Sequence, residues 1–456
     1  MALKLIVEQA SITTRHPFAI ARGSTNGYKR AWVRLVDGNG QEGWGEADPS
    51  SFYGESLETV LKAFERLGPH LPLDPFDLEA AEARWAQVLP KNWSARAALS
   101  AALHDLVGKA LGQPLWRLWG LDPRKAPLSS FTIGLDTTEK IRDKVREAKA
   151  YPILKIKLGT DRDETILKTI RDATDKPIRV DANAGWDVAR AKQMIPKLKE
   201  FGVEFLEQPL VPEDLDGLVE VRRVAAKHQI PIVVDESCLV AADIPRLAGR
   251  VDGINIKLAK CGSLREALRM IATARAHGML VMVGCMIETS LGITAAAHFT
   301  PLVDAADLDG AALTVDDPFS GATIDQGQIR LPTARRPRRS RARATAAAER
   351  RGNHDGDCHC PAVSRCRHQA DFRSSRRRAR ALPGLACPGS LDVRLLRRPA
   401  GPVAAGAASG TAVERRPAGG AGTGRRAAVR AHRQRRGFPA RARATLQTVA
   451  QAARSL

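Results

Sequence analysis

The sequence predicts an α/β protein: a (β/α)₈-type barrel with an N-terminal α+β capping domain and a disordered arginine-rich tail. Three observations predict it. Strand and helix patterns alternate eight times after residue 127, both patterns are mixed before it, and the composition changes abruptly after Pro332. The expected domains are a capping domain over 1–127, a barrel over 128–316, a return segment onto the capping domain over 317–332, and the tail over 333–456.

The capping domain shows both kinds of periodicity. Alternating apolar and polar side chains predict half-buried strands, and apolar residues at helical spacing predict helices. A polar residue before a helical pattern predicts its N-cap. The expected elements are strands over 3–12 and 30–36, loops over 21–27 and 50–56, and helices over 57–67, 75–89 and 94–111, with Asp77 and Ser94 as caps.

The barrel is predicted from a repeat. Apolar runs recur every 21 to 27 residues, with amphipathic helical stretches between them. Catalytic residues of such barrels lie at the carboxyl ends of the strands. The eighth unit is the least regular, because residues 307–310 are polar and short. The runs start near Phe131, Leu154, Ile178, Phe205, Ile232, Gly253, Leu280 and Asp307.

The net charge of +21 belongs to the tail. Residues 333–456 hold 29 arginines, no lysine and six acidic residues, a net +23. The remaining 42 of 71 basic and 44 of 50 acidic residues leave the rest slightly acidic. A chain of this composition cannot bury enough apolar surface to fold, so we expect disorder. Arg, Ala, Pro and Gly also dominate GC-rich reading frames, so a frameshifted end is our preferred hypothesis for the tail.

The chain is expected to be cytoplasmic, without membrane contact. Residues 1–8 alternate like a strand and carry early charges, unlike a secretory signal. The longest apolar run, 279–287, is far shorter than a membrane span. Cys238, Cys261 and Cys285 show no paired spacing, which fits a reducing compartment.

Three apolar runs end on an acidic residue. These residues are Asp181, Glu207 and Asp235, separated by 26 and 28 positions. Each interval fits one strand, one helix and two loops, so the carboxylates meet if the strands are parallel neighbours. Hard divalent cations prefer such oxygen ligands. The sequence therefore predicts a Mg²⁺ site.

Lysines on two predicted strands indicate acid–base chemistry. Lys155 and Lys157 face the same way, into a barrel interior that normally holds apolar side chains. Lys257 ends the sixth strand, across the ring from Lys157 on the second. Two opposed amines can take a proton from one face of a carbon and return it to the other, and Lys155 or the cation would lower an amine's pKa. We predict Lys157 and Lys257 as catalytic, and Lys260 as a loop residue.

Five short motifs together resemble the muconate-lactonizing branch of the enolase superfamily. The resemblance covers residues 1 to about 332. It implies a capping domain whose two loops close over the barrel mouth, and Mg²⁺ stabilising an enolate. The motifs are Lys155-Ile156-Lys157, Asp181-Ala182-Asn183, Glu207-Gln208-Pro209, Asp235-Glu236-Ser237 and Asn255-Ile256-Lys257.

Within that branch, the sequence is most similar to dipeptide epimerases of the L-Ala-D/L-Glu type. Asp307 and Asp309 resemble the acidic pair that holds the substrate's amino group in those enzymes. Arg22 resembles the loop arginine that grips the glutamate side chain. Thr132 and Lys155 are further expected substrate contacts. The plainer interpretations are that the acidic pair caps a helix and that Arg22 is a surface charge.

The predicted function is Mg²⁺-dependent epimerisation at the C-terminal residue of a small dipeptide, with L-Ala-D/L-Glu as the expected substrate. The alternative within the same branch is an o-succinylbenzoate synthase or N-succinylamino acid racemase. Nucleic-acid binding through the tail is an alternative of another class, but arginine runs without interleaved aromatics give only nonspecific, salt-sensitive affinity. Nucleic acid is therefore not an expected partner, and a homo-oligomer stays open.

Overall fold

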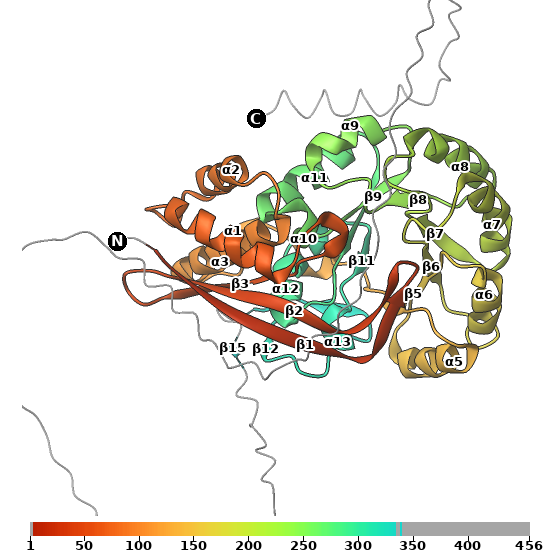
Figure 1. Ribbon diagram of the computed structural model, residues 1–456, viewed down its shortest axis with the longest axis horizontal. Coiled ribbons are helices and arrows are strands. Elements are labelled where there is room, and N and C mark those ends of the chain that lie inside the picture. The colour runs from red at the N-terminus through yellow and green to blue at the C-terminus, as the bar shows by residue number, and fades with distance from the viewer. Residues whose placement is uncertain (1–2, 334–337, 340–456) are drawn as a thin grey trace, which may run out of the picture. The chain divides into compact units, whose positions relative to one another are not determined.

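The computed structural model describes residues 3–333 and the backbone of 338–339 (Figure 1). Eight parallel strands follow one another in sequence order, and a bridge between Ser129 and Ala306 joins the last to the start of the first. The predicted (β/α)₈-type barrel is thereby confirmed, while nearly all of the predicted tail lies outside the described residues. The strands are β4 (Phe131–Ile133), β5 (Leu154–Lys157), β6 (Ile178–Asp181), β7 (Val203–Glu207), β8 (Ile232–Val234), β9 (Gly253–Ile256), β10 (Leu280–Gly284) and β11 (Ala305–Asp307).

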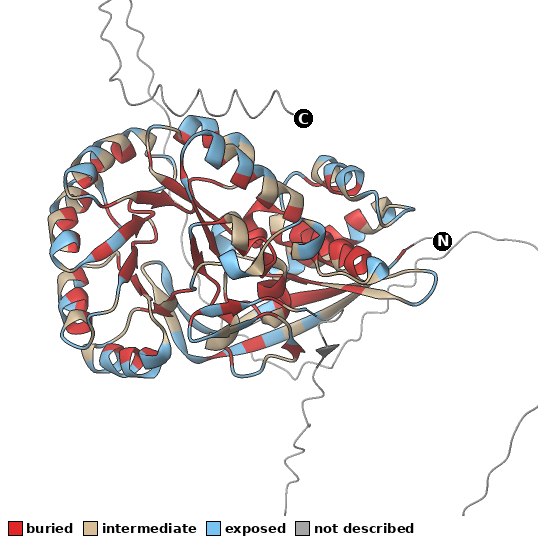
Figure 2. Cartoon of the chain, turned by 180° about the vertical axis from the view of Figure 1, so that it is seen from behind, coloured by how far each residue is buried: buried red, intermediate tan, exposed pale blue. Residues whose placement is uncertain are grey.

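Helices surround the barrel and turn their exposed faces outward (Figure 2). Their apolar stripes pack on the strands, which are buried on both faces, as parallel strands require. The helices are α5 (Thr138–Glu147), α6 (Asp163–Arg171), α7 (Val188–Glu200), α8 (Leu215–Lys227), α9 (Ile244–Leu247), α10 (Leu258–Cys261), α11 (Leu264–Ala276), α12 (Ser290–Ala297) and α13 (Gly310–Leu313).

The capping domain is a three-stranded antiparallel sheet covered by helices. Strand β3 lies directly against α3, because it has glycines at the contact: a Cβ on Gly45 would lie 2.0 Å from the carbonyl oxygen of Ala98. The elements are β1 (Lys4–Ile20), β2 (Gly23–Val36), β3 (Glu42–Ala47), α1 (Leu57–Leu67), α2 (Leu78–Val88), α3 (Trp93–Leu111) and α4 (Leu115–Leu118).

Two local predictions for this domain are wrong. The expected loop over 21–27 is instead the tip of a long β1–β2 hairpin, in which only Ala21 and Arg22 form the turn. Its residues are polar because the hairpin end is largely exposed, not because they lack strand structure. Ser94 lies inside α3, where its hydroxyl donates to the buried Glu55 carboxylate, and Asn92 takes the cap position.

Hydrogen bonds of buried charged side chains join the capping domain to the barrel. Arg30 on β2 pairs with Asp48 (Nη1–Oδ1 2.7 Å) and donates through Nε to the Ile287 carbonyl oxygen at 3.1 Å. Glu46 on β3 accepts from the backbone N–H groups of Thr289 and Gly292, both at 3.2 Å. The capping sheet is therefore bonded to the segment that links β10 to α12.

Burial, and then the charge of Glu288, raise the pKa of Glu46 from 4.5 to about 7. The folded protein then holds a proton that the unfolded chain releases, so this part of the stability falls as pH rises from about 4.5 to about 7. Glu46→Gln is expected to remove this dependence, which amounts to at most about 3 kcal/mol at about 1.4 kcal/mol per pKa unit. Urea unfolding of the wild type and of Glu46→Gln at pH 5 and pH 7 measures the free energy of unfolding. An equal change in this free energy with pH in both proteins would contradict the prediction.

After the barrel the chain returns toward the capping domain. Phe319 packs edge-on against Trp32 and Trp44, with ring centroids 4.9 and 5.7 Å apart. The predicted domain boundaries stay predictions. No helix in the described part of the chain is long and apolar enough to cross a membrane. The elements of the return are β12 (Phe319–Ser320), β13 (Thr323–Asp325), β14 (Gln328–Arg330) and β15 (Arg338–Arg339).

Candidate active site

Polar side chains gather at the carboxyl ends of the barrel strands. Strand register pairs Lys157 with Asp181 and Asp181 with Glu207, so these three residues end neighbouring strands at one level. Asp235 directly follows β8, the next strand, and Lys257 directly follows β9. The parallel ladder thus brings residues 100 positions apart in the sequence to one rim.

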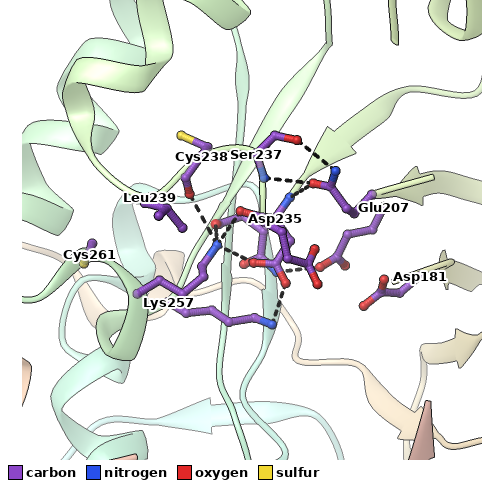
Figure 3. A network of polar contacts seen from close by, with 12 residues as sticks. Asp181, Glu207, Asp235, Ser237, Cys238, Leu239, Lys257 and Cys261 are labelled. Atoms are coloured by element: carbon purple, nitrogen blue, oxygen red, sulfur yellow. Dashed lines mark hydrogen bonds and ion pairs between the residues drawn. The ribbon is translucent and has the colours of Figure 1, made fainter. Parts of the chain in front are cut away.

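The three acidic residues predicted as metal ligands are buried side by side (Figure 3). The backbone N–H of Asn183 donates to Asp181 Oδ1 at 2.8 Å, and the Asn255 side chain donates to Glu207 Oε1 at 2.7 Å. Lys257 Nζ donates to Asp235 Oδ2 at 2.7 Å. Each carboxylate therefore has at least one oxygen oriented by a partner from a strand end.

Lys155 lies at the centre of this group and is 1% exposed. Its Nζ is 2.8 Å from Glu207 Oε2, 2.9 Å from Asp307 Oδ2 and 3.3 Å from Asp181 Oδ2. A lysine this deeply buried needs such partners. It joins the predicted metal ligands to the predicted amine-binding acids on the other side of the ring.

The two predicted catalytic lysines pair with different carboxylates. Lys157 Nζ donates to Asp181 Oδ2 at 2.7 Å, while Lys257 donates to Asp235. Their strands, β5 and β9, are separated by three strands in the ring. Both side chains line the same cavity, so two amines reach it from strands on different sides of the barrel.

Burial and neighbouring charges shift the pKa values of two of the carboxyl groups in opposite directions. Burial alone would raise the pKa of Asp181, but Lys157 and Lys155 outweigh it and hold the pKa below its usual range. Burial and the Asp181 charge raise the pKa of Glu207 to about 7. The group therefore contains carboxyls of very different acidity within a few ångströms.

The prediction of a lowered amine pKa is wrong for Lys257. Burial lowers its pKa, and so does the nearby charge of Lys155, but the carboxylates of Asp235, Glu207 and Glu236 together outweigh both and raise it above its usual value. The same balance raises the pKa of Lys155, whose strongest partners are Asp307 and Glu207. Sequence reasoning considered the charge of Lys155 but not the charges of the carboxylates around Lys257.

Asp307 and Asp309 both line the cavity from the end of β11. Asp307 Oδ1 accepts from Ser130 Oγ at 2.7 Å, and Asp309 Oδ2 accepts from the Thr132 backbone N–H at 2.6 Å. Burial and then the Asp307 charge raise the pKa of Asp309 to about 7, whereas Lys155 lowers that of Asp307. Thr132 thus contacts both acids as well as the cavity.

Arg22, at the hairpin tip, reaches across to the barrel. Its Nη2 is 2.8 Å from Glu236 Oε1 and its Nη1 donates to the Asn183 carbonyl oxygen at 2.7 Å. The guanidinium lies 4.4 Å from the centre of the Phe52 ring. Glu236 also lines the cavity, and sequence reasoning gave it no role although it directly follows Asp235.

The cavity beneath the hairpin has a volume of about 530 Å³, within the range of small-molecule sites. Its barrel side holds all three lysines, Lys155, Lys157 and Lys257, and the acids Asp235, Asp307 and Asp309. Its capping side includes Arg22 and Tyr53. Polar groups converge on a space large enough for a dipeptide.

The acidic residues suit Mg²⁺ by their chemistry. In the residues that the structure describes, no group of three His, Cys, Asp or Glu side chains is arranged so that it could hold a metal ion. Lysine ammonium groups lie among the carboxylates and pair with them. Asp181, Glu207 and Asp235 still offer buried oxygens from three adjacent strand ends, the ligand type that Mg²⁺ prefers.

Fold and site define an enzyme of the enolase superfamily. Residues 3–120 match the mandelate racemase / muconate lactonizing enzyme N-terminal domain, and residues 137–336 match the enolase C-terminal domain-like family. The chain therefore belongs to the mandelate racemase / muconate lactonizing enzyme family.

Several proteins similar to this chain are named as epimerases. The L-Ala-D/L-Glu epimerase of Bacteroides thetaiotaomicron is 42% identical over 72% of this chain and 85% of its own length. An L-Ala-D/L-amino acid epimerase of a Maribacter species is 38% identical over 73% of this chain and 97% of its own length. The crystal structure of an Enterococcus faecalis dipeptide epimerase, complexed with Mg and L-Leu-L-Tyr, is 33% identical, with a TM-score of 0.69 over 73% of this chain and 98% of that one.

Proposed function

We propose that this protein is a Mg²⁺-dependent dipeptide epimerase that inverts the α-carbon of the C-terminal residue, with L-Ala-D/L-Glu as its substrate. One observation carries the proposal: two lysines from well-separated strands enter a cavity that is also lined by two acidic side chains, Asp307 and Asp309, at the end of β11. The similar proteins support it, since they are named as epimerases of such dipeptides.

Asp181, Glu207 and Asp235 are the proposed metal ligands. Mg²⁺, when bound, supplies positive charge that stabilises the negative charge developing on the substrate carboxylate. Lys155, held among the same carboxylates, places a second positive charge beside that position. Asn183 and Asn255 orient the ligand oxygens through the hydrogen bonds described above.

Lys157 and Lys257 are the proposed acid and base. One, as the free amine, takes the α-proton; the C–H electron pair moves into the carboxylate to give an enolate. The other, as the ammonium, donates a proton to the opposite face of the same carbon. The product has inverted configuration, and the reverse reaction exchanges the two roles. Because β5 and β9 are well separated in the ring, the two lysines can approach the α-carbon from its two faces.

Asp307 and Asp309 are proposed to bind the free amino group of the dipeptide, with Thr132 holding both acids in place. An ammonium needs acceptors, and two carboxylates at one strand end provide them. An N-succinylated substrate has no ammonium group. Its succinyl carboxylate would instead lie close to the carboxylates of Asp307 and Asp309, which would repel it. This arrangement favours a dipeptide over an N-acylated amino acid.

A dipeptide library incubated in D₂O tests the proposal. Ala-Glu is expected to take up deuterium at the α-carbon of glutamate and to epimerise, while N-succinyl-glutamate and N-acetyl-Ala-Glu do neither. Chelation with EDTA should stop the reaction and added Mg²⁺ restore it. Faster turnover of the N-blocked compounds would replace the proposal with an N-succinylamino acid racemase.

Arg22 is proposed to select the glutamate side chain, since a guanidinium fork suits a carboxylate. Arg22→Met is expected to lower kcat/KM for Ala-Glu by about 10- to 100-fold, the value of a hydrogen bond to a charged group. Turnover of Ala-Leu should change little. Arg15→Met, which removes an exposed arginine of the same hairpin, is the control. An equal loss for both dipeptides would assign Arg22 to closing the site only.

A further inference from the structure

Lys260 is a fully buried lysine that the proposed reaction does not use. It lies in the short helix α10, not in a loop as predicted, and is 1% exposed. Its side chain does not line the substrate cavity. A lone ammonium is costly to bury, so its surroundings must compensate the charge.

The Lys260 ammonium contacts oxygen atoms at the ends of two barrel strands and in the loop that follows one of them. Nζ donates to the carbonyl oxygens of Asp235 at 2.7 Å and Asn255 at 2.9 Å, and lies 3.4 Å from that of Cys238. It also forms a close ion pair with Asp235 Oδ1. One ammonium thus bonds the end of β8, the loop after it and β9.

Two lysines divide the Asp235 carboxylate between them. Lys260 holds Oδ1, whereas Lys257, which lines the cavity, holds Oδ2. The main chain at this point is fixed as well, because Gln208 Oε1 accepts from the Asp235 and Ser237 N–H groups at 2.9 and 3.2 Å. Lys260 therefore acts on a side chain whose backbone is already in place.

The same ammonium is linked to a second proposed ligand. Asn255, whose carbonyl oxygen Lys260 binds, donates its side-chain amide to Glu207 Oε1 at 2.7 Å. Lys260, Asn255 and the two carboxylates form one bonded chain beneath the cavity. A displacement of Lys260 would move Asp235 directly and Glu207 through Asn255.

We propose that Lys260 is a positioning residue for the metal site: it holds Asp235 Oδ1 from beneath, so that Oδ2 alone is presented to the cavity. The inference rests on the proposed function, because it takes Asp235 as a metal ligand. Outer partners of metal ligands set ligand orientation and charge, and their loss typically costs 10- to 100-fold in affinity.

The test is calorimetric titration of the metal-stripped full chain with MgCl₂. Lys260→Met is expected to weaken Mg²⁺ binding by roughly 10- to 100-fold. Lys260→Arg, which keeps the charge and the donors, should stay closer to the wild type. Lys109→Met removes a half-buried, ion-paired lysine, on α3 beside Asp105, and should leave the affinity unchanged. With Mg²⁺ saturating, Lys260→Met should recover most of its kcat, because no group that touches substrate has been removed.

The outcomes separate the two proposals. If the wild type does not bind Mg²⁺, the proposed metal site is wrong. If the wild type binds and Lys260→Met binds equally well, the role of Lys260 is wrong. If Lys260→Met does not fold, the double variant Lys260→Met, Asp235→Asn decides, since it removes the uncompensated carboxylate. A double variant that regains the folded circular dichroism spectrum supports the pairing, and one that stays unfolded overturns it.

Discussion

Lys157→Ala is expected to abolish epimerisation. A positioned acid–base group usually contributes about 10²- to 10⁴-fold to the rate, so kcat should fall by about that factor or more. The fold should survive, because Asp181 keeps Lys155 at 3.3 Å and the Asn183 N–H as partners. Polarimetry on Ala-Glu measures the loss, and thermal unfolding checks the fold. Lys144→Ala, which removes a buried lysine of α5 paired with Asp136, is the matched control and should keep its activity.

Isotope exchange makes this prediction sharper. If each lysine serves one face of the α-carbon, Lys157→Ala should still exchange the α-proton of one epimer in D₂O, through Lys257, without inverting it. The other epimer should not exchange. Lys257→Ala should show the opposite preference. Loss of exchange with both epimers in both variants, or retained epimerisation in either, would rule out the two-base arrangement.

The barrel could be predicted because its signals are local. A strand such as β5 is a short apolar run, its lysines alternate within it, and the strand spacing places Asp181, Glu207 and Asp235 on successive strands. The hairpin tip at 21–27 could not be predicted in the same way, because Ser, Thr, Asn and Gly at an exposed strand end have the composition of a loop.

The proposed ligands and lysines were visible in the sequence, but their partners were not. Glu236 pairs with Arg22 across 214 positions, and Asn255 reaches Glu207 from two strands away. Such contacts depend on side-chain directions that only the assembled barrel defines. The raised pKa of Lys257 belongs to the same class, since it depends on the contact with Asp235 and on the other carboxylates that the barrel brings near it.

One signal for Lys260 was present and was misread. The segment 253–262 is otherwise apolar or small apart from Asn255 and Lys257, so a further lysine there needs a buried acceptor. Counting three residues past a strand end placed it in a loop. The short helix α10 turns it back beneath the strand ends instead, where it meets Asp235.

Glu207→Gln is expected to have the second large effect. Glu207 ends the middle of the three strands that carry the proposed ligands and is fully buried. Glutamine keeps its length and can still accept from Asn255, so the fold should persist, but the site loses one of its three anionic ligands. Mg²⁺ affinity should fall by more than about 100-fold, because even outer-shell partners are worth 10- to 100-fold.

Epimerisation at moderate Mg²⁺ should then fall to background, and calorimetry should show the lost affinity directly. Glu204→Gln is the matched control: it lies three residues earlier on β7, is exposed, and pairs with Arg179 at 3.0 Å. It removes the same charge from the same strand, away from the cavity. Because the two variants remove a carboxylate from opposite ends of β7, equal Mg²⁺ affinity in both would mean that the strand-end carboxylates do not hold the metal.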